Sequence, residues 1–107
     1  MTTDRYTYRV TWSAEDQEYL GTCIEFPSLS WLDEDEDEAF RGIRKLVREV
    51  VADMQANDET IPPPLSEKRY SGKFQIRTTP EIHRKLAIEA AEAHVSINRW
   101  INSKLAG

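Results

Sequence analysis

Three consecutive prolines, Pro62-Pro63-Pro64, divide this chain into two parts. Proline has a fixed φ and no backbone N–H, so a run of three cannot continue a helix and favours an extended, semi-rigid spacer. The following residues stay polar as far as Gly72, and we therefore interpret residues 61–72 as a linker. In a chain of 107 residues, each flanking part is near the lower size limit for independent stability. We expect two small units, residues 1–60 and 73–107.

The first unit begins with patterns that predict β-strands. Residues 6–12 alternate apolar and polar side chains and are rich in β-formers, which is typical of a strand with one apolar face. A polar turn separates them from residues 18–24, which predict the second strand of a hairpin. Residues 29–32 are short and apolar enough to form a third strand.

Six consecutive acidic residues, Asp33 to Glu38, come next. We interpret them as a helix start rather than a metal site, because carboxylates are favourable at the positive end of the helix dipole. A long amphipathic pattern follows at once, with apolar residues at three- and four-residue spacing, and it predicts a helix from about Asp35 to Gln55. The first unit is therefore expected to be an α+β domain, a small antiparallel sheet packed by one long helix.

The second unit predicts a strand followed by two helices. Residues 73–78 alternate polar and apolar side chains. Thr79 can cap the first helix and Pro80 suits its first position, while Ser96 can cap the second helix. A lone strand has no partner inside so small a unit, and unpaired strand edges tend to pair with another copy. We expect a homodimer or higher homo-oligomer whose core contains Phe74, Ile76, Ile82, Leu86, Trp100 and Ile101.

The polar face of the resulting two-stranded ribbon has the side chains that read bases. Lys73, Gln75 and Arg77 share that face, because side chains alternate along a strand. Arginine and lysine pair with guanine and glutamine pairs with adenine, and a two-stranded ribbon fits the major groove. These three residues are the predicted base contacts.

The second helix and the charge distribution favour the same partner. Backbone amides at Ser96, Ile97 and Asn98 are predicted to bind a DNA phosphate, as helix N-termini do. Up to Ser71 the chain has 16 acidic and 8 basic residues, whereas from Gly72 onward it has 3 acidic and 6 basic. The basic end suits a polyanion, and the acidic front suits a basic protein.

The segment from Lys73 to Leu105 resembles the ribbon-helix-helix repressors of the Arc and MetJ type, which read DNA with a β-ribbon. The resemblance rests on the alternation of the strand and on two short motifs, Pro80-Glu81-Ile82 and Val95-Ser96-Ile97-Asn98. It implies that the three polar strand residues contact bases and that the start of the second helix binds phosphate.

The first unit resembles the HicB antitoxin family. The resemblance rests on the hairpin and on three later features: Phe26-Pro27-Ser28-Leu29, the acid-rich helix entry with Glu38-Ala39, and Ile61-Pro62-Pro63-Pro64. It implies a partial ribonuclease-H-like fold. It also implies an antitoxin that binds and occludes a HicA-like ribonuclease toxin and represses its own operon by binding operator DNA as a dimer.

The toxin-facing surface is expected to include an exposed aromatic anchor and neighbouring acids, since aromatic residues dominate interface energetics and acids attract a basic toxin. The residues concerned are Trp31, Asp33, Glu34 and Asp35. The alternative is a stand-alone ribbon-helix-helix repressor whose N-terminal domain senses a ligand or mediates oligomerisation.

Nothing in the sequence predicts an enzyme. The acids lie in one consecutive run, which points them around a helix rather than at two catalytic cations. Cys23 and two histidines are too common a set to indicate a nucleophile, and zinc-ligand spacing is absent. We expect no catalytic residue, metal or cofactor. The single cysteine and the lack of a long apolar run indicate a reduced, cytoplasmic setting away from membranes.

Overall fold

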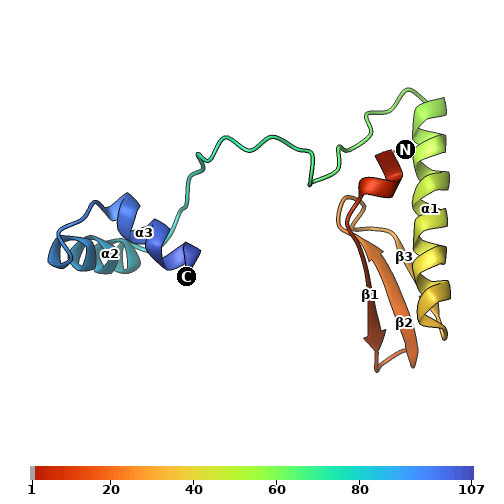
Figure 1. Ribbon diagram of the computed structural model, residues 1–107, viewed down its shortest axis with the longest axis horizontal. Coiled ribbons are helices and arrows are strands. Elements are labelled where there is room, and N and C mark those ends of the chain that lie inside the picture. The colour runs from red at the N-terminus through yellow and green to blue at the C-terminus, as the bar shows by residue number, and fades with distance from the viewer. Residues whose placement is uncertain (1) are drawn as a thin grey trace. The chain divides into compact units, whose positions relative to one another are not determined.

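The computed structural model describes residues 2–107, which form two compact units, one ending at Tyr70 and one running from Ser71 to Gly107. The first unit contains a short 3-10 helix η1 (Thr2–Arg5), strands β1 (Tyr8–Ser13), β2 (Glu18–Cys23) and β3 (Ser30–Asp33), and helix α1 (Glu36–Ala56) (Figure 1). The second contains α2 (Pro80–Glu92) and α3 (Ile97–Ala106). The predicted α+β class is confirmed.

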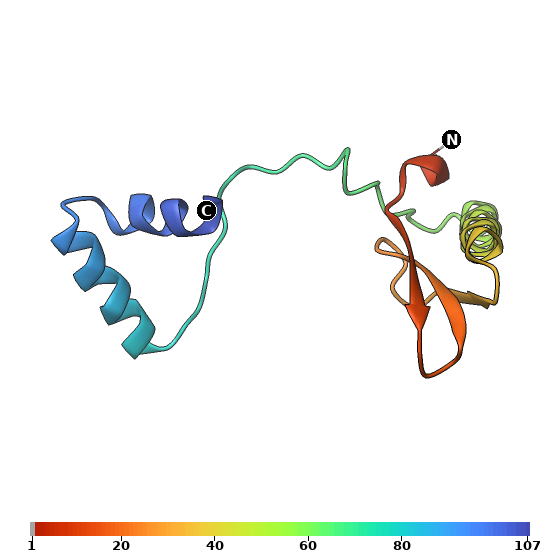
Figure 2. The same cartoon turned by 60° about the horizontal axis from the view of Figure 1, so that its bottom comes forward.

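The three strands form one antiparallel sheet in the order β1-β2-β3, and α1 covers one face of it (Figure 2). Gly21 in the central strand allows the helix to come close. A Cβ atom at this position would lie 2.7 Å from the carbonyl oxygen of Ala39 and 2.9 Å from Cγ2 of Ile43. Only glycine fits a strand that a helix backbone approaches this closely.

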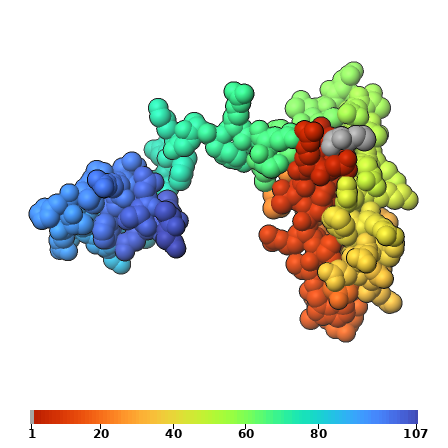
Figure 3. Space-filling model, in the orientation of Figure 1, coloured from red at the N-terminus to blue at the C-terminus, as the bar shows by residue number. Residues whose placement is uncertain are grey.

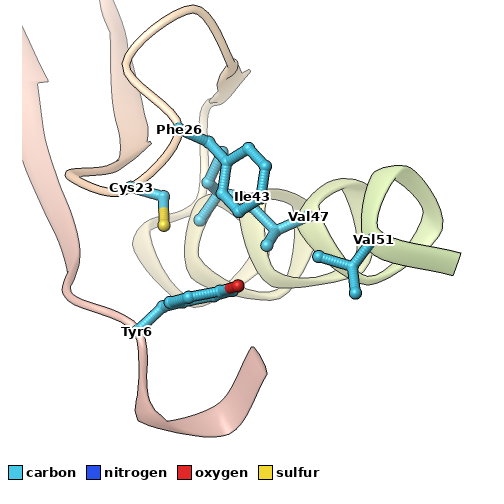
Figure 4. Packing of buried hydrophobic residues seen from close by; sticks show 6 residues of the cluster. All are labelled: Tyr6, Cys23, Phe26, Ile43, Val47 and Val51. Carbon is cyan, nitrogen blue, oxygen red and sulfur yellow. The ribbon is translucent and has the colours of Figure 1, made fainter. Parts of the chain in front are cut away.

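The core of this unit lies between the sheet and α1. Six buried side chains form it: Tyr6, Cys23, Phe26, Ile43, Val47 and Val51 (Figure 4). The rings of Tyr6 and Phe26 meet edge to face, with centroids 5.4 Å apart. Burial raises the pKa of the Cys23 thiol to about 11, so at neutral pH this side chain is a protonated, small apolar group.

The acidic run starts α1, as the sequence predicts. Asp35 is the N-cap residue, and its side chain accepts hydrogen bonds from the backbone N–H groups of Asp37 and Glu38. Asp33 accepts one from the backbone N–H of Asp35, at 2.9 Å. These carboxylates satisfy amides that a helix start otherwise leaves without partners.

The proline segment contacts the N-terminal unit. The hydroxyl of Tyr6 donates to the carbonyl oxygen of Pro62 at 2.7 Å, and Arg5 pairs with Glu67 at 2.7 Å. The backbone N–H of Leu65 donates to the Glu25 carboxylate at 3.0 Å. In the space-filling view the green segment after α1 lies against the red N-terminal residues (Figure 3). The first part of the segment interpreted as a linker is therefore packed on the sheet unit.

Glu25 connects this segment to the start of β1. Its carboxylate also accepts from the backbone N–H of Thr7 at 2.9 Å and from the Thr7 hydroxyl at 3.2 Å. Desolvation raises the pKa of this carboxyl, but the backbone N–H groups of Leu65 and Thr7 outweigh it and hold the pKa below the ordinary value of 4.5. The ionised form is therefore the one that the fold stabilises.

The Glu25→Gln variant is expected to lose part of the pH dependence of stability. A lowered folded-state pKa stabilises the fold fully above the unfolded pKa, and that contribution disappears as pH falls through the folded pKa. Urea unfolding of both proteins at pH 6 and again below pH 4 measures the effect. The free energy of unfolding of the two proteins is expected to differ at pH 6, and this difference should shrink in acid. An equal difference at both pH values would contradict this role of Glu25.

The second unit is a helical hairpin with the predicted caps. The Thr79 hydroxyl accepts from the N–H of Ile82 at 3.2 Å, and the Ser96 hydroxyl accepts from the N–H of Arg99 at 3.0 Å. Between the helices His94 has a φ of 57°, and the next N–H, of Val95, bonds back to the carbonyl of Ala90 at 3.1 Å. This is the Schellman pattern that ends helices, with histidine where glycine is usual.

Residues 73–78, where the sequence predicts a strand, have no regular secondary structure in the single chain. The expected pairing partner of that strand is a second copy. None of the helices within residues 2–107 is long and apolar enough to cross a membrane. In the same residues, no group of three or more His, Cys, Asp or Glu side chains is placed to hold a metal ion.

Candidate nucleic-acid interface

The segment before α2 exposes both its polar and its apolar residues. Lys73, Gln75 and Arg77, the predicted base contacts, are all exposed. Between them, Phe74 is 75% exposed and Ile76 is 58% exposed. Burying apolar surface of this size is the main driving force of association. The segment thus has an apolar set of side chains that the single chain leaves uncovered.

An apolar hollow lies beside this segment, within the C-terminal unit. It has a volume of about 760 Å³, and its apolar lining includes Ile76, Leu86, Ile97, Ile101 and Leu105. Three of these residues, Ile76, Leu86 and Ile101, belong to the predicted dimer core. Arg77 also lines this hollow. Apolar residues of α2, α3 and the extended segment therefore line the same hollow.

A second hollow brings the two predicted DNA-contacting groups together. It has a volume of about 460 Å³ and is lined by Lys73 and Phe74 from the segment and by Asn98 from α3. The first amides of a helix have no partner inside the helix. The Ser96 cap accepts from Arg99, which leaves the N–H groups of Ile97 and Asn98 at the N-terminus for an anion. Lys73 of the segment and Asn98, near the start of α3, thus line one concave surface.

Trp100, predicted in the dimer core, is anchored within its own chain. Its indole N–H donates to the Glu89 carboxylate at 3.1 Å, and the Lys104 ammonium lies 4.7 Å from the centre of its ring. The side chain is partly buried between α2 and α3. Trp100 therefore ties the two helices together, and Glu89 is a partner that the sequence patterns did not identify.

The remaining predicted core residue, Ile82, is 48% exposed on α2. Ile88 on the same helix is 47% exposed, although it lies off the predicted apolar stripe. Exposure alone therefore does not mark the dimer core. The apolar stripe distinguishes Ile82 and Leu86 from Ile88, and Leu86 also lines the hollow of about 760 Å³.

The predicted toxin-facing residues cluster where β3 leads into α1. Asp33 and Asp35 form the helix cap, and Glu34 is exposed. Trp31 is 38% exposed, and its indole lies over Gly42 of α1, where a Cβ atom would overlap the ring. Two of these acids therefore have a structural role, and Trp31 presents only part of its surface.

Gly42, in the middle of α1, is the sequence signal that could have indicated this packing. Glycine inside a helix costs about 1 kcal/mol relative to alanine. Its presence within an otherwise regular amphipathic pattern therefore favours a close contact at that position. The structure shows that the contact is with Trp31.

A family model supports the resemblance to the HicB antitoxin family. Residues 56–105 match the HicB family. The match begins at the last residue of α1 and includes the proline segment, the extended segment, α2 and nearly all of α3. No curated protein and no solved structure matches the chain.

Proposed function

We propose that the chain is a HicB-type antitoxin that dimerises through a C-terminal ribbon-helix-helix module and binds operator DNA. The HicB match over residues 56–105 supports the antitoxin role. The observation that carries the DNA-binding half is the alternation of exposed Lys73, Gln75 and Arg77 with exposed Phe74 and Ile76. A second copy would pair with this segment and cover the apolar residues, and the polar ones would face the major groove.

The proposed module needs a second copy to complete its core. A unit of this size cannot bury enough apolar surface alone. The second copy's segment and helices would fill the hollow of about 760 Å³ beside Ile76 and Leu86. Phosphates on either side of the groove would bind the free backbone amides at the start of α3.

The Arg77→Ala variant is expected to weaken operator binding by about 1–3 kcal/mol and to relax base preference, since one bidentate base contact has this value. The matched control is Arg84→Ala, which removes the same charge from an exposed position on α2. A gel-shift titration on the chain's own promoter at two salt concentrations separates specific from general binding. Equal losses for both variants would show that Arg77 contributes only charge.

In the proposed complex the N-terminal unit binds a basic ribonuclease and covers its active site, with no chemistry by this chain. The excess of acidic over basic residues up to Ser71, 16 to 8, would steer such a partner. Co-expression with a small basic ribonuclease encoded beside this gene tests the idea. We expect a stable complex in which RNA cleavage stops. Free ribonuclease activity in the presence of excess, folded antitoxin would exclude it.

The second candidate is a stand-alone repressor whose N-terminal unit binds a ligand or assembles oligomers. The family match lies almost entirely outside the sheet and α1, which leaves the role of that unit open to this interpretation. A small molecule that raises the melting temperature of the full chain without affecting ribonuclease would favour it.

A further inference from the structure

Strand β1 is an edge strand whose outer side has no strand beside it. The sheet order is β1-β2-β3, and among the elements of residues 2–107 only β2 and α1 pack against β1 (Figure 1). An unpaired edge presents backbone N–H and C=O groups to any strand that can align with it. The residues whose backbone groups are exposed at this edge determine how an added strand can align with β1.

The hydrogen-bond pattern determines which residues of β1 point outward. The N–H of Ile24 donates to the carbonyl of Thr7 at 3.0 Å, so Thr7 bonds toward β2. In an antiparallel pair this role alternates along the strand. The backbone groups of Arg9, Thr11 and Ser13 therefore also point toward β2, and those of Tyr8, Val10 and Trp12 point toward the open edge.

This edge lacks the features that usually prevent strand addition. Such features are prolines, bulges, several charges or a very short strand. β1 has six residues in unbroken one-to-one register with β2, contains no proline and has Arg9 as its single charge. The other edge, β3, has only four residues and leads directly into the acidic run. The open side of β1 is therefore the edge suited to pairing.

Exposed aromatic rings lie at both ends of the same edge. Trp12 is 52% exposed and packs edge-on against Tyr19 at 5.0 Å between centroids. At the other end Phe40 of α1 is 39% exposed and meets Tyr8 at 6.1 Å. Trp12 and Tyr8 are on the same face of the sheet, because they are an even number of residues apart.

We propose that the β1 strands of two copies of this chain pair antiparallel about a two-fold axis at Val10. This is the one two-fold register within β1 that places all three outward residues opposite outward residues, with about six backbone hydrogen bonds. Tyr8 lies opposite Trp12 of the second copy, which brings that indole next to Phe40. Arg9 lies opposite Thr11, whereas an axis at Arg9 would place two arginines opposite each other.

The interface is self-complementary, and that favours a second copy over a strand from another protein. In the proposed pair, the exposed ring at one end of the edge of one copy covers the exposed ring at the other end of the edge of the second copy. A two-fold axis brings the same patch of both copies together. This pairing involves the N-terminal unit alone and does not depend on the proposed DNA-binding dimer.

The Val10→Cys variant of the full chain tests the register by disulfide formation. Paired residues on the axis have Cα atoms about 5.5 Å apart, within the range that a disulfide spans. The matched control is Arg9→Cys. In the proposed register the two copies of residue 9 are offset by two positions along the strands, so their Cα atoms would be about 8 Å apart, too far for a disulfide. The natural Cys23 is 1% exposed and sets the background. We expect mild oxidation to give about tenfold more cross-linked dimer for Val10→Cys than for Arg9→Cys.

A second variant measures association without cysteine chemistry. Val10→Pro removes an outward N–H that no hydrogen bond among residues 2–107 uses, so the fold should persist while pairing is lost. Sedimentation should show a smaller assembly with an unchanged circular dichroism spectrum. Repeating the Val10→Cys cross-linking in a Phe74→Ala background separates this interface from the C-terminal dimer: cross-linking should persist there. Equal cross-linking at positions 9 and 10, or none at position 10 in folded protein, would overturn the proposal.

Discussion

The Phe74→Ala variant is expected to dissociate the proposed C-terminal dimer, weakening association by about 3–5 kcal/mol. The reason is that Phe74, 75% exposed in the single chain, has little to lose within its own unit and would bury its ring only against a second copy. Sedimentation equilibrium of the Val10→Pro chain, in which the N-terminal contact is removed, measures this dimer alone. Operator binding should fall with it, because two half-sites need two modules.

The matched control for this change is Ile88→Ala on α2. Ile88 is also exposed but lies off the stripe formed by Ile82 and Leu86. This variant should dimerise and bind DNA like the parent chain. If Phe74→Ala remained fully dimeric, or if both variants dissociated equally, the core assignment for the C-terminal module would be wrong.

The Ile43→Ala variant is expected to lower the free energy of unfolding of the N-terminal unit by about 2–5 kcal/mol. Ile43 is fully buried at the centre of the core, beside Val47 and against Gly21 of the sheet. Alanine would leave a cavity that the surrounding strands cannot close completely. A loss of this size is a large fraction of the total stability of a small domain.

Urea unfolding followed by tryptophan fluorescence measures this effect, because Trp12 and Trp31 report on the N-terminal unit. The Ile43→Val variant provides a graded control, with an expected loss of about 0.5–1.5 kcal/mol. DNA binding at low temperature should be unaffected by either change as long as the unit stays folded. Equal losses in the free energy of unfolding for the two variants would show that the lost stability does not come from packing at Ile43.

Local patterns in the sequence predicted the elements of this fold closely. The helix expected from about Asp35 to Gln55 is α1, Glu36–Ala56, because its start depends on a cap and an acidic first turn that lie within a few residues of each other. The caps at Thr79 and Ser96 are confirmed for the same reason. The first strand was predicted two residues early, since Tyr6 continues the alternation but leaves the sheet to bury its ring against Phe26.

Contacts between distant residues were not predictable in this way. Glu25 and Leu65 are 40 residues apart, and no local pattern indicates that the carboxylate of one holds the backbone of the other. The same holds for the Arg44–Asp4 ion pair at 2.7 Å and for Trp100 with Glu89. Such pairs depend on the direction in which whole elements approach, and many side chains together determine that direction.

The sequence by itself determined the type, order and caps of the elements and the alternation of Lys73, Gln75 and Arg77 with apolar residues. These features follow from backbone preferences and from side-chain periods of 2 and 3.6 residues, which act over short distances. The tertiary structure alone decided that the proline segment is packed on the sheet unit, that Trp31 is seated over Gly42, and that β1 has an open edge. These are results of close packing between elements, where the fit depends on three-dimensional shape rather than on the neighbours in sequence.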